Sequence, residues 1–221
     1  MGFTRATAET EFAAVLTGDL RQSRKIDANA LQTAMSCIES AAEDIARDTA
    51  LTLRFDRHRG DGWQIYLPHA EPALRAALRI VAALKAQTGL STRIAIGIGQ
   101  AILPPDGDLG AASGEAFIGA GDMLDGMERN QNLAIDWRCG PFIPALVGLL
   151  DWQSQQWTAP QAEALFEALR SQAPTQEEIA GKFGVSRQAI QLRLAATGLS
   201  ALREALTAYE THIQHVWETH R

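Results

Sequence analysis

The segment Phe12–Asp27, FAAVLTGDLRQSRKID, contains the two patterns that decide the fold of the first half of this chain. It begins as a nearly continuous apolar run and stops at a Gly-Asp pair, which predicts a short strand buried on both faces and ending in a turn. Three basic residues follow within five positions of the exit. An acidic residue at the end of a buried strand, with cations just beyond it, marks the first candidate site.

The next segments alternate between helical and extended patterns. Apolar residues recur at steps of three or four in one segment, GDG lies between two extended runs as in a β-hairpin, and β-branched residues alternate further on. The expected order is strand 12–18, helix 27–48, hairpin 50–68, helix 71–89, strand 91–103, helix from 114 and strand 132–137. This order predicts an α+β, ferredoxin-like domain with helices on one face of the sheet.

Composition limits the class of protein. The chain has 221 residues, 46% of them hydrophobic, and a net charge of −6, which disfavours coating of nucleic acid through bulk electrostatics. It has no signal-peptide pattern and no apolar run of about 18 residues, so we expect a cytoplasmic protein without membrane segments. Cys37 and Cys139 have no metal-site spacing, and we expect two reduced, packed thiols.

After residue 140 the pattern becomes purely helical. We predict a palm-like α+β domain over 1–140, a connector helix over 141–157 and an all-α domain over 158–221. Thr158 is the expected N-cap of a helix with Pro160 in its first turn. An apolar stripe on the last helix predicts a homodimer face; it comprises Leu202, Leu206, Tyr209, Ile213, Val216 and Trp217.

The segment Thr175–Gly198, TQEEIAGKFGVSRQAIQLRLAATG, has the pattern of a helix-turn-helix. Ile179, Ala180 and Phe183 form the inner face of the first helix, and Gly184 permits the positive φ of the turn. Residues with side chains suited to phosphates and base edges would face outward from the second helix, and they predict contact with DNA: Ser186, Arg187, Gln188, Gln191 and Arg193. The alternative is a packing or dimerisation module whose polar residues are simply solvated.

Asp61, in the turn of the expected hairpin, pairs with Asp19 at the first candidate site. If their strands are neighbours, both carboxylates lie at one edge of the sheet. Mutual repulsion of about 4 kcal/mol then implies either a bound cation such as Mg²⁺ or Mn²⁺ or a raised pKa of one carboxyl. A nucleotide phosphate would then be held by nearby polar and basic residues: Arg21, Ser23, Arg24 and Lys25. The alternative is an ordinary turn followed by a solvated helix start.

Several ordered motifs resemble the SatD family of bacterial proteins. They are TGDLRQSRKI, RGDGWQIYL, RIAIGIGQA, SGEAFIGAGDML and the late WTAPQAEALFEAL with TQEEIAGKFGVSRQAIQLRL, which together cover most of the chain. The resemblance implies the same two-part architecture with a C-terminal helix-turn-helix. It implies less about activity.

The N-terminal half also resembles, more distantly, the palm-like domain of class III nucleotidyl cyclases. This resemblance implies that Asp19 and Asp61 bind two metal ions that hold a nucleotide triphosphate, and it places Arg57 where the family has a base-selecting lysine. Where the family has an Asn and an Arg on a late helix, this chain has Ile118 and Asp122. Loss of that Arg removes a cation that stabilises the transition state.

Two functions therefore follow as hypotheses. The first is a DNA-binding transcriptional regulator, acting as a homodimer, whose palm-like domain senses a nucleotide through Mg²⁺ or Mn²⁺. The second is an enzyme, a divergent nucleotidyl cyclase or nucleotidyltransferase that uses Asp19 and Asp61. A palm domain that serves only as a scaffold is a third alternative.

Overall fold

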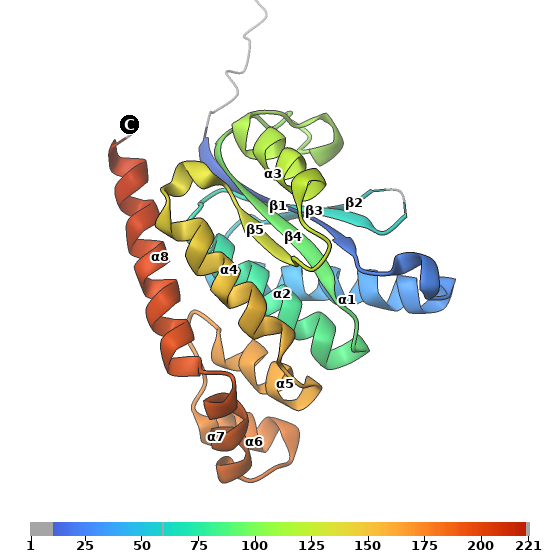
Figure 1. Cartoon of the computed structure of the whole chain (residues 1–221), viewed down its shortest axis with the longest axis vertical. Helices are drawn as coiled ribbons and strands as arrows, with labels where there is room; N and C mark the ends of the chain where they lie inside the picture. Colours follow the sequence, from blue (N-terminus) through green and yellow to red (C-terminus); the bar gives the residue numbers. More distant parts are fainter. Residues whose placement is uncertain (1–10, 59, 220–221) are drawn as a thin grey trace, which may run out of the picture.

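A five-stranded sheet forms the centre of the molecule in the computed structural model, which describes residues 11–58 and 60–219 (Figure 1). The strands are β1 (Glu11–Leu20), β2 (Arg54–Arg57), β3 (Gly62–Leu67), β4 (Thr92–Ala101) and β5 (Leu133–Ile135). Their order is β2-β3-β1-β4-β5, with β1 antiparallel to both of its neighbours and β5 parallel to β4. Both faces of β1 are covered by other elements, and this explains its continuous apolar run.

The first six elements have the predicted ferredoxin-like order. The helices α1 (Ala28–Thr49) and α2 (Ala73–Thr88) connect β1 to the β2–β3 hairpin and the hairpin to β4. Their apolar stripes pack with alternate residues of the sheet, such as Leu16 and Ile96, in one large buried cluster. The α+β, ferredoxin-like prediction is confirmed for this part of the chain.

The third helix, α3 (Glu115–Gly126), lies on the opposite face of the sheet from α1 and α2 (Figure 1). It packs on the alternate set of β1 residues, Ala13 and Val15. Gly97 of β4 permits this contact, since a Cβ there would lie 2.0 Å from the carbonyl oxygen of Ala116. The prediction of helices on one face only is therefore wrong, because the small residues on the second face leave room for a helix.

The remaining helices pack beside the sheet domain. They are α4 (Phe142–Gln155), α5 (Ala159–Ala168), α6 (Gln176–Phe183), α7 (Arg187–Ala196) and α8 (Leu199–Thr219). α4 contacts β5 and α8, and α5 packs on α2. The large buried cluster continues from the sheet through α2 into α5 and α8. The proposed boundary at 141–157 stays a prediction.

The long apolar stripe of α8 belongs to this intrachain core. Leu202, Leu206, Tyr209 and Ile213 are all 0% exposed, and the Tyr209 hydroxyl donates to the carbonyl oxygen of Ala70 at 3.1 Å. The prediction that this stripe is a dimer face is wrong, because a helical stripe of this width fits a partner in the same chain equally well. The side chain of Trp217 lies outside the described residues.

The expectation of two packed, unpaired thiols is borne out. Cys37 and Cys139 are free, buried thiols, and burial raises their pKa values to about 11 and about 12. Within the part of the chain that the structure describes, none of the helices combines the length and apolar character required to cross a bilayer.

Candidate functional site

The end of β1 brings the two predicted acidic residues to the same end of the sheet. Asp19 lies opposite Gly62 of β3, directly after Asp61, and the Leu20 amide donates to the Asp61 carbonyl oxygen at 3.3 Å. The convergence predicted from the Gly-Asp pattern therefore holds for the backbone. On its other side Asp19 lies opposite Arg93 of β4.

Arg93 occupies both oxygens of the Asp19 carboxylate. Its Nε donates to Asp19 Oδ1 at 2.8 Å, and its Nη2 donates to Oδ2, so the pair is bidentate. The hydrogen bond with Asp19 raises the Arg93 pKa, and the charges of Asp19, Asp125 and Asp61 add to this, although partial burial acts in the other direction. The cation that the acidic pair requires is thus supplied by the chain itself.

This arrangement decides whether a divalent metal fits at Asp19. Mg²⁺ and Mn²⁺ prefer several free oxygen ligands around one point, whereas both Asp19 oxygens already accept from a guanidinium. Among residues 11–58 and 60–219, none of the His, Cys, Asp and Glu side chains form a group of three or more able to hold a metal ion. The side chains around Asp19, as they are arranged, do not fit a metal ion.

The basic residues after β1 lie in a tight turn. Gln22 has a positive φ of 55°, and Ser23–Lys25 form a short 3₁₀ helix in which Arg24 and Lys25 are exposed and Ser23 is half-buried. Arg21 donates to the carbonyl oxygen of Arg129. These cations lie near Asp19 in sequence, but Arg21 is directed to a backbone acceptor.

The N-terminus of α1 is already capped. The Asp27 carboxylate accepts from the Ala30 amide at 2.7 Å, so the helix end that follows the basic turn carries its own anion. A bound phosphate would face that carboxylate. Arg57 donates from Nη1 to Gln32 Oε1 at 2.6 Å, which places its guanidinium against α1.

A hollow lies beside α3, at Ile118 and Asp122, the two positions where this chain departs from the cyclase pattern. It encloses about 330 Å³, and its lining includes Ile118, Asp122 and the Arg138 side chain. Arg138 donates from Nε to the buried Asp136 carboxylate at 2.9 Å, and this hydrogen bond raises the Arg138 pKa. A cation is therefore present here, although sequence reasoning identified none.

Sequence reasoning missed Arg93 and Arg138 for different reasons. The pairing of Arg93 with Asp19 depends on strand register between residues 74 positions apart, which no local pattern encodes. The ion pair of Arg138 with Asp136 could in principle have been predicted from the sequence, because an Asp directly after a strand often pairs with an Arg two positions later. That signal is weak on its own.

The C-terminal candidate is the surface formed by α6 and α7. The two helices are joined by a turn in which Gly184 has a φ of 64°, and the Ser186 hydroxyl caps α7 by accepting from the Ala189 amide at 3.1 Å. Ile190 and Leu194 are buried against α5. Ile190 and Leu194 therefore face inward as predicted, whereas Arg193 does not face outward as predicted, because it pairs with Glu163 on α5.

The predicted DNA-binding residues fall into two groups. Arg187, Gln188 and Gln191 are exposed on the first turns of α7. Arg193 is half-buried and donates to the Glu163 carboxylate on α5 at 3.4 Å. The first group presents its polar groups to solvent, whereas Arg193 is partly committed to holding α7 against α5.

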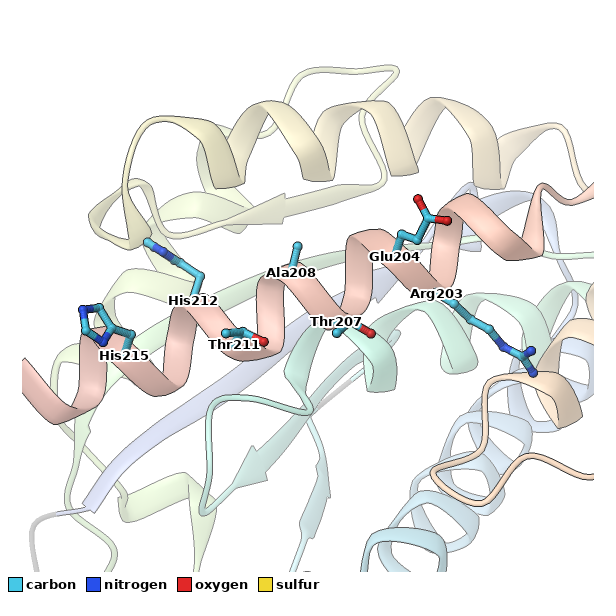
Figure 2. Close-up of a pocket in the computed structure, with 7 residues that line it drawn as sticks. All are labelled: Arg203, Glu204, Thr207, Ala208, Thr211, His212 and His215. Atoms are coloured by element: carbon cyan, nitrogen blue, oxygen red, sulfur yellow. The ribbon is translucent and has the colours of Figure 1, made fainter.

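A further hollow lies along α8 and encloses about 730 Å³. Its lining residues all belong to this single helix, as Figure 2 shows, and include Thr207, Thr211 and His215. His212, at one end, lies 2.7 Å through Nε2 from the carbonyl oxygen of Cys139. The lining residues come from one helix and include no convergent set of ligand groups, so this groove is not a candidate site.

Comparisons with known proteins give partial structural likenesses at low sequence identity. No family model matches the sequence, and the search of curated proteins gives no match. The chain is similar to a solved rhodopsin-guanylyl cyclase catalytic core in complex with ATPalphaS, with a TM-score of 0.48, 17% identity, and coverage of 60% of this chain and 83% of that one. For the guanylyl cyclase Cya2 the values are 0.43, 15%, 58% and 76%, and for the adenylyl cyclase CyaB from P. aeruginosa they are 0.41, 16%, 57% and 77%.

These values describe a partial likeness to nucleotidyl cyclases, and we carry no activity across from it. Membership of the SatD family and the DNA-binding role of α6 and α7 stay predictions.

Proposed function

We propose that this protein binds double-stranded DNA through α7. The observation that supports the proposal is the division of α7 into a buried face, Ile190 and Leu194, and an exposed first turn with Arg187, Gln188 and Gln191. Arg pairs with guanine edges and phosphates, and Gln pairs with adenine edges. A short helix held at its N-cap by Ser186 presents these side chains as a recognition helix does.

The charges around α7 limit how strongly DNA is held. Lys182 donates to the buried Glu167 at 2.7 Å, and Arg193 pairs with Glu163, so both cations have acidic partners in the same chain. The overall charge of −6 adds no general attraction for phosphate. We therefore expect binding that depends on specific contacts of Arg187 and the two glutamines, with a small dependence on salt.

The experiment selects duplexes from a random library with the full chain at low salt, followed by fluorescence anisotropy. Arg187→Ala should weaken binding by about 1–3 kcal/mol, because it removes a base or phosphate contact. Arg47→Ala, an exposed arginine on α1 with ion pairs to Glu43 and Asp44, is the matched control and should bind as the wild type does. Failure to select any duplex at low salt would contradict the proposal.

The second candidate function is a metal-dependent nucleotidyl cyclase or nucleotidyltransferase. The observation that favours it is the convergence of Asp19 and Asp61 at one end of a sheet whose fold is similar to that of nucleotidyl cyclases. The bidentate contact of Arg93 opposes it, because Asp19 would have to release this guanidinium before it bound a metal ion. Arg138 is a further cation near α3 for this candidate.

Incubation of the wild type with the four nucleoside triphosphates and Mg²⁺ or Mn²⁺, followed by mass analysis, separates the two candidates. Product that disappears in Asp19→Ala and Asp61→Ala would establish the enzyme. Absence of product together with duplex binding would favour the regulator. Calorimetry without any metal-dependent nucleotide binding would favour a palm domain that serves only as a scaffold.

A further inference from the structure

The helix α4 has two apolar faces, and only one of them is covered. Ile143, Val147 and Leu150 are buried in the core. Phe142, Leu149 and Trp152 are exposed by 83%, 68% and 67%. Three large apolar side chains with this exposure on one helix of 14 residues require a separate explanation.

The exposed residues form one stripe. With Ala145, which is also exposed, they recur at steps of three, four and three along the helix. At 3.6 residues per turn this spacing places them within about a quarter of the circumference, opposite the buried face. The same spacing is typical of the seam between two packed helices.

The stripe carries no charge. Asp151 is the one charged residue within α4, and it is buried, accepting from the Asn132 amide and from Gln155 Nε2 at 3.0 Å each. A charged peptide or nucleic acid would find no complementary group on this face. A second copy of the same face brings no like charges together, so an uncharged stripe is suited to pairing with itself.

The exposed apolar area of the stripe is a substantial part of what a dimer interface needs. Aromatic and large aliphatic side chains bury about 150–250 Å² each when fully covered, so the three exposed ones offer on the order of 400 Å² per copy. This is about half of the roughly 800 Å² that each partner contributes to a stable interface. Ala145 and the neighbouring surface of α4 extend it.

We propose that α4 is the interface of a homodimer in which two copies of the stripe pack antiparallel about a two-fold axis. In this arrangement Phe142 faces the partner's Trp152, and Ala145 faces the partner's Leu149. Large side chains then oppose small ones at the centre, and aromatic rings meet at both ends. A parallel arrangement would place Ala145 against its own copy and leave a gap there.

The interface is independent of the DNA proposal. α4 carries none of the residues assigned to DNA contact. Dimerisation through α4 would hold two α7 helices in a symmetric pair, as a two-fold symmetric duplex requires. Loss of DNA binding with an intact dimer, or the reverse, distinguishes failure of one proposal from failure of the other.

Sedimentation equilibrium of the full chain at micromolar concentration tests the interface. We expect the wild type at twice the mass of the chain, and Leu149→Arg should raise the dimer dissociation constant at least roughly 30-fold, because the change places a charge in the centre of the seam. Ile118→Arg is the matched control, since Ile118 is 63% exposed on α3 and should leave the dimer intact. Circular dichroism of each variant confirms that it is folded. A monomeric wild type, or a dimer unaffected by Leu149→Arg, overturns the proposal.

Cysteine cross-linking tests the antiparallel register. Cys37 and Cys139 are buried and their pKa values are raised, so they react slowly with an oxidant. A mixture of Ala145→Cys and Leu149→Cys chains should form a disulfide-linked dimer, and each variant alone should form much less. Efficient cross-linking of either variant alone would overturn the antiparallel arrangement.

Discussion

The end of β1 and the first turns of α7 both carry polar and charged residues, but those at β1 pair within the chain and those on α7 are exposed. At the end of β1, the carboxylate of Asp19 is bound at both oxygens by Arg93, which reaches it from the neighbouring strand. On α7, Arg187, Gln188 and Gln191 are exposed to solvent. A polar cluster at the end of an element therefore does not indicate a ligand site until the partners supplied by adjacent elements are known.

The physical reason for the difference is the number of neighbours. β1 is central, with strands on both sides, so its last residues meet side chains from two directions. α7 packs on α5, α6 and α8, whereas Arg187, Gln188 and Gln191 in its first turns are exposed. Ion pairing within the chain is thus favoured at the sheet, and contact with an external ligand is favoured at α7.

The largest expected effect concerns the packing that holds α7. Ile190 is 0% exposed and contacts the apolar residues of α5 and α6. Ile190→Ala should lower the free energy of unfolding by about 2–4 kcal/mol, because it leaves a cavity in a small cluster. Urea denaturation measures this loss. Leu192→Ala is the control, since Leu192 is 65% exposed and its truncation should cost far less.

The next largest effect is expected when the guanidinium of Arg93, which pairs with Asp19 at the end of β1, is removed. Arg93→Ala should lower stability by about 2 kcal/mol and leave Asp19 and Asp61 without their common cation. Millimolar Mn²⁺ should then raise the melting temperature of the variant and leave that of the wild type unchanged. Arg75→Ala is the matched control, because Arg75 makes a similar bidentate pair with Glu210 at 2.7 and 3.0 Å.

The change in melting temperature with Mn²⁺ tests whether Arg93 and a metal ion compete for Asp19. Stabilisation of the wild type equal to that of Arg93→Ala would mean that Arg93 does not compete with a metal ion. Stabilisation of Arg75→Ala to the same extent would mean that any exposed carboxylate is sufficient.

A smaller effect depends on pH. Glu167 is buried on α5, and although burial alone would raise its pKa, the hydrogen bonds from Arg170 and Lys182 lower it below the ordinary value of 4.5. A carboxyl whose folded-state pKa is lowered stabilises the protein above the ordinary value, and this contribution is lost as the pH falls through the folded-state pKa. Glu167→Gln should therefore cost on the order of 1 kcal/mol near neutral pH and progressively less below pH 4.5.

Denaturation of the wild type and Glu167→Gln at a series of pH values measures this difference. A cost that stays constant from neutral to acidic pH would show that the charge of Glu167 is not what connects α5 to α6.

The smallest effect separates the two groups of α7 residues. Arg193→Ala should change duplex affinity by less than about 0.5 kcal/mol, because its guanidinium is engaged with Glu163. Anisotropy alongside Arg187→Ala measures the contrast. Equal losses for both variants would place Arg193 in contact with DNA and reverse our assignment.

Local patterns in the sequence were sufficient for most elements and for the ferredoxin-like order. The Gly-Asp pattern predicted the end of β1 to within two residues, and the turn at Gly184 was predicted from residue type. Each depends on near neighbours in the chain, so the sequence contains the necessary information.

What the sequence did not predict depends on distant pairing. The contact of Arg93 with Asp19 requires the register of β1 and β4, and the position of α3 requires knowledge of which sheet face has room. An apolar stripe also does not specify its partner. The stripe of α8 is buried inside the chain, whereas Phe142, Leu149 and Trp152 of α4 remain exposed.

The most direct test of the comparison is one NMR titration of the ¹⁵N-labelled full chain, first with a selected duplex and then with a small amount of Mn²⁺. We predict that the duplex shifts the amide signals of Arg187, Gln188 and Gln191, and that Mn²⁺ leaves the signals around Asp19 and Gly62 unbroadened. Strong paramagnetic broadening at Asp19 and Gly62, with unchanged α7 signals in the presence of DNA, would contradict the account.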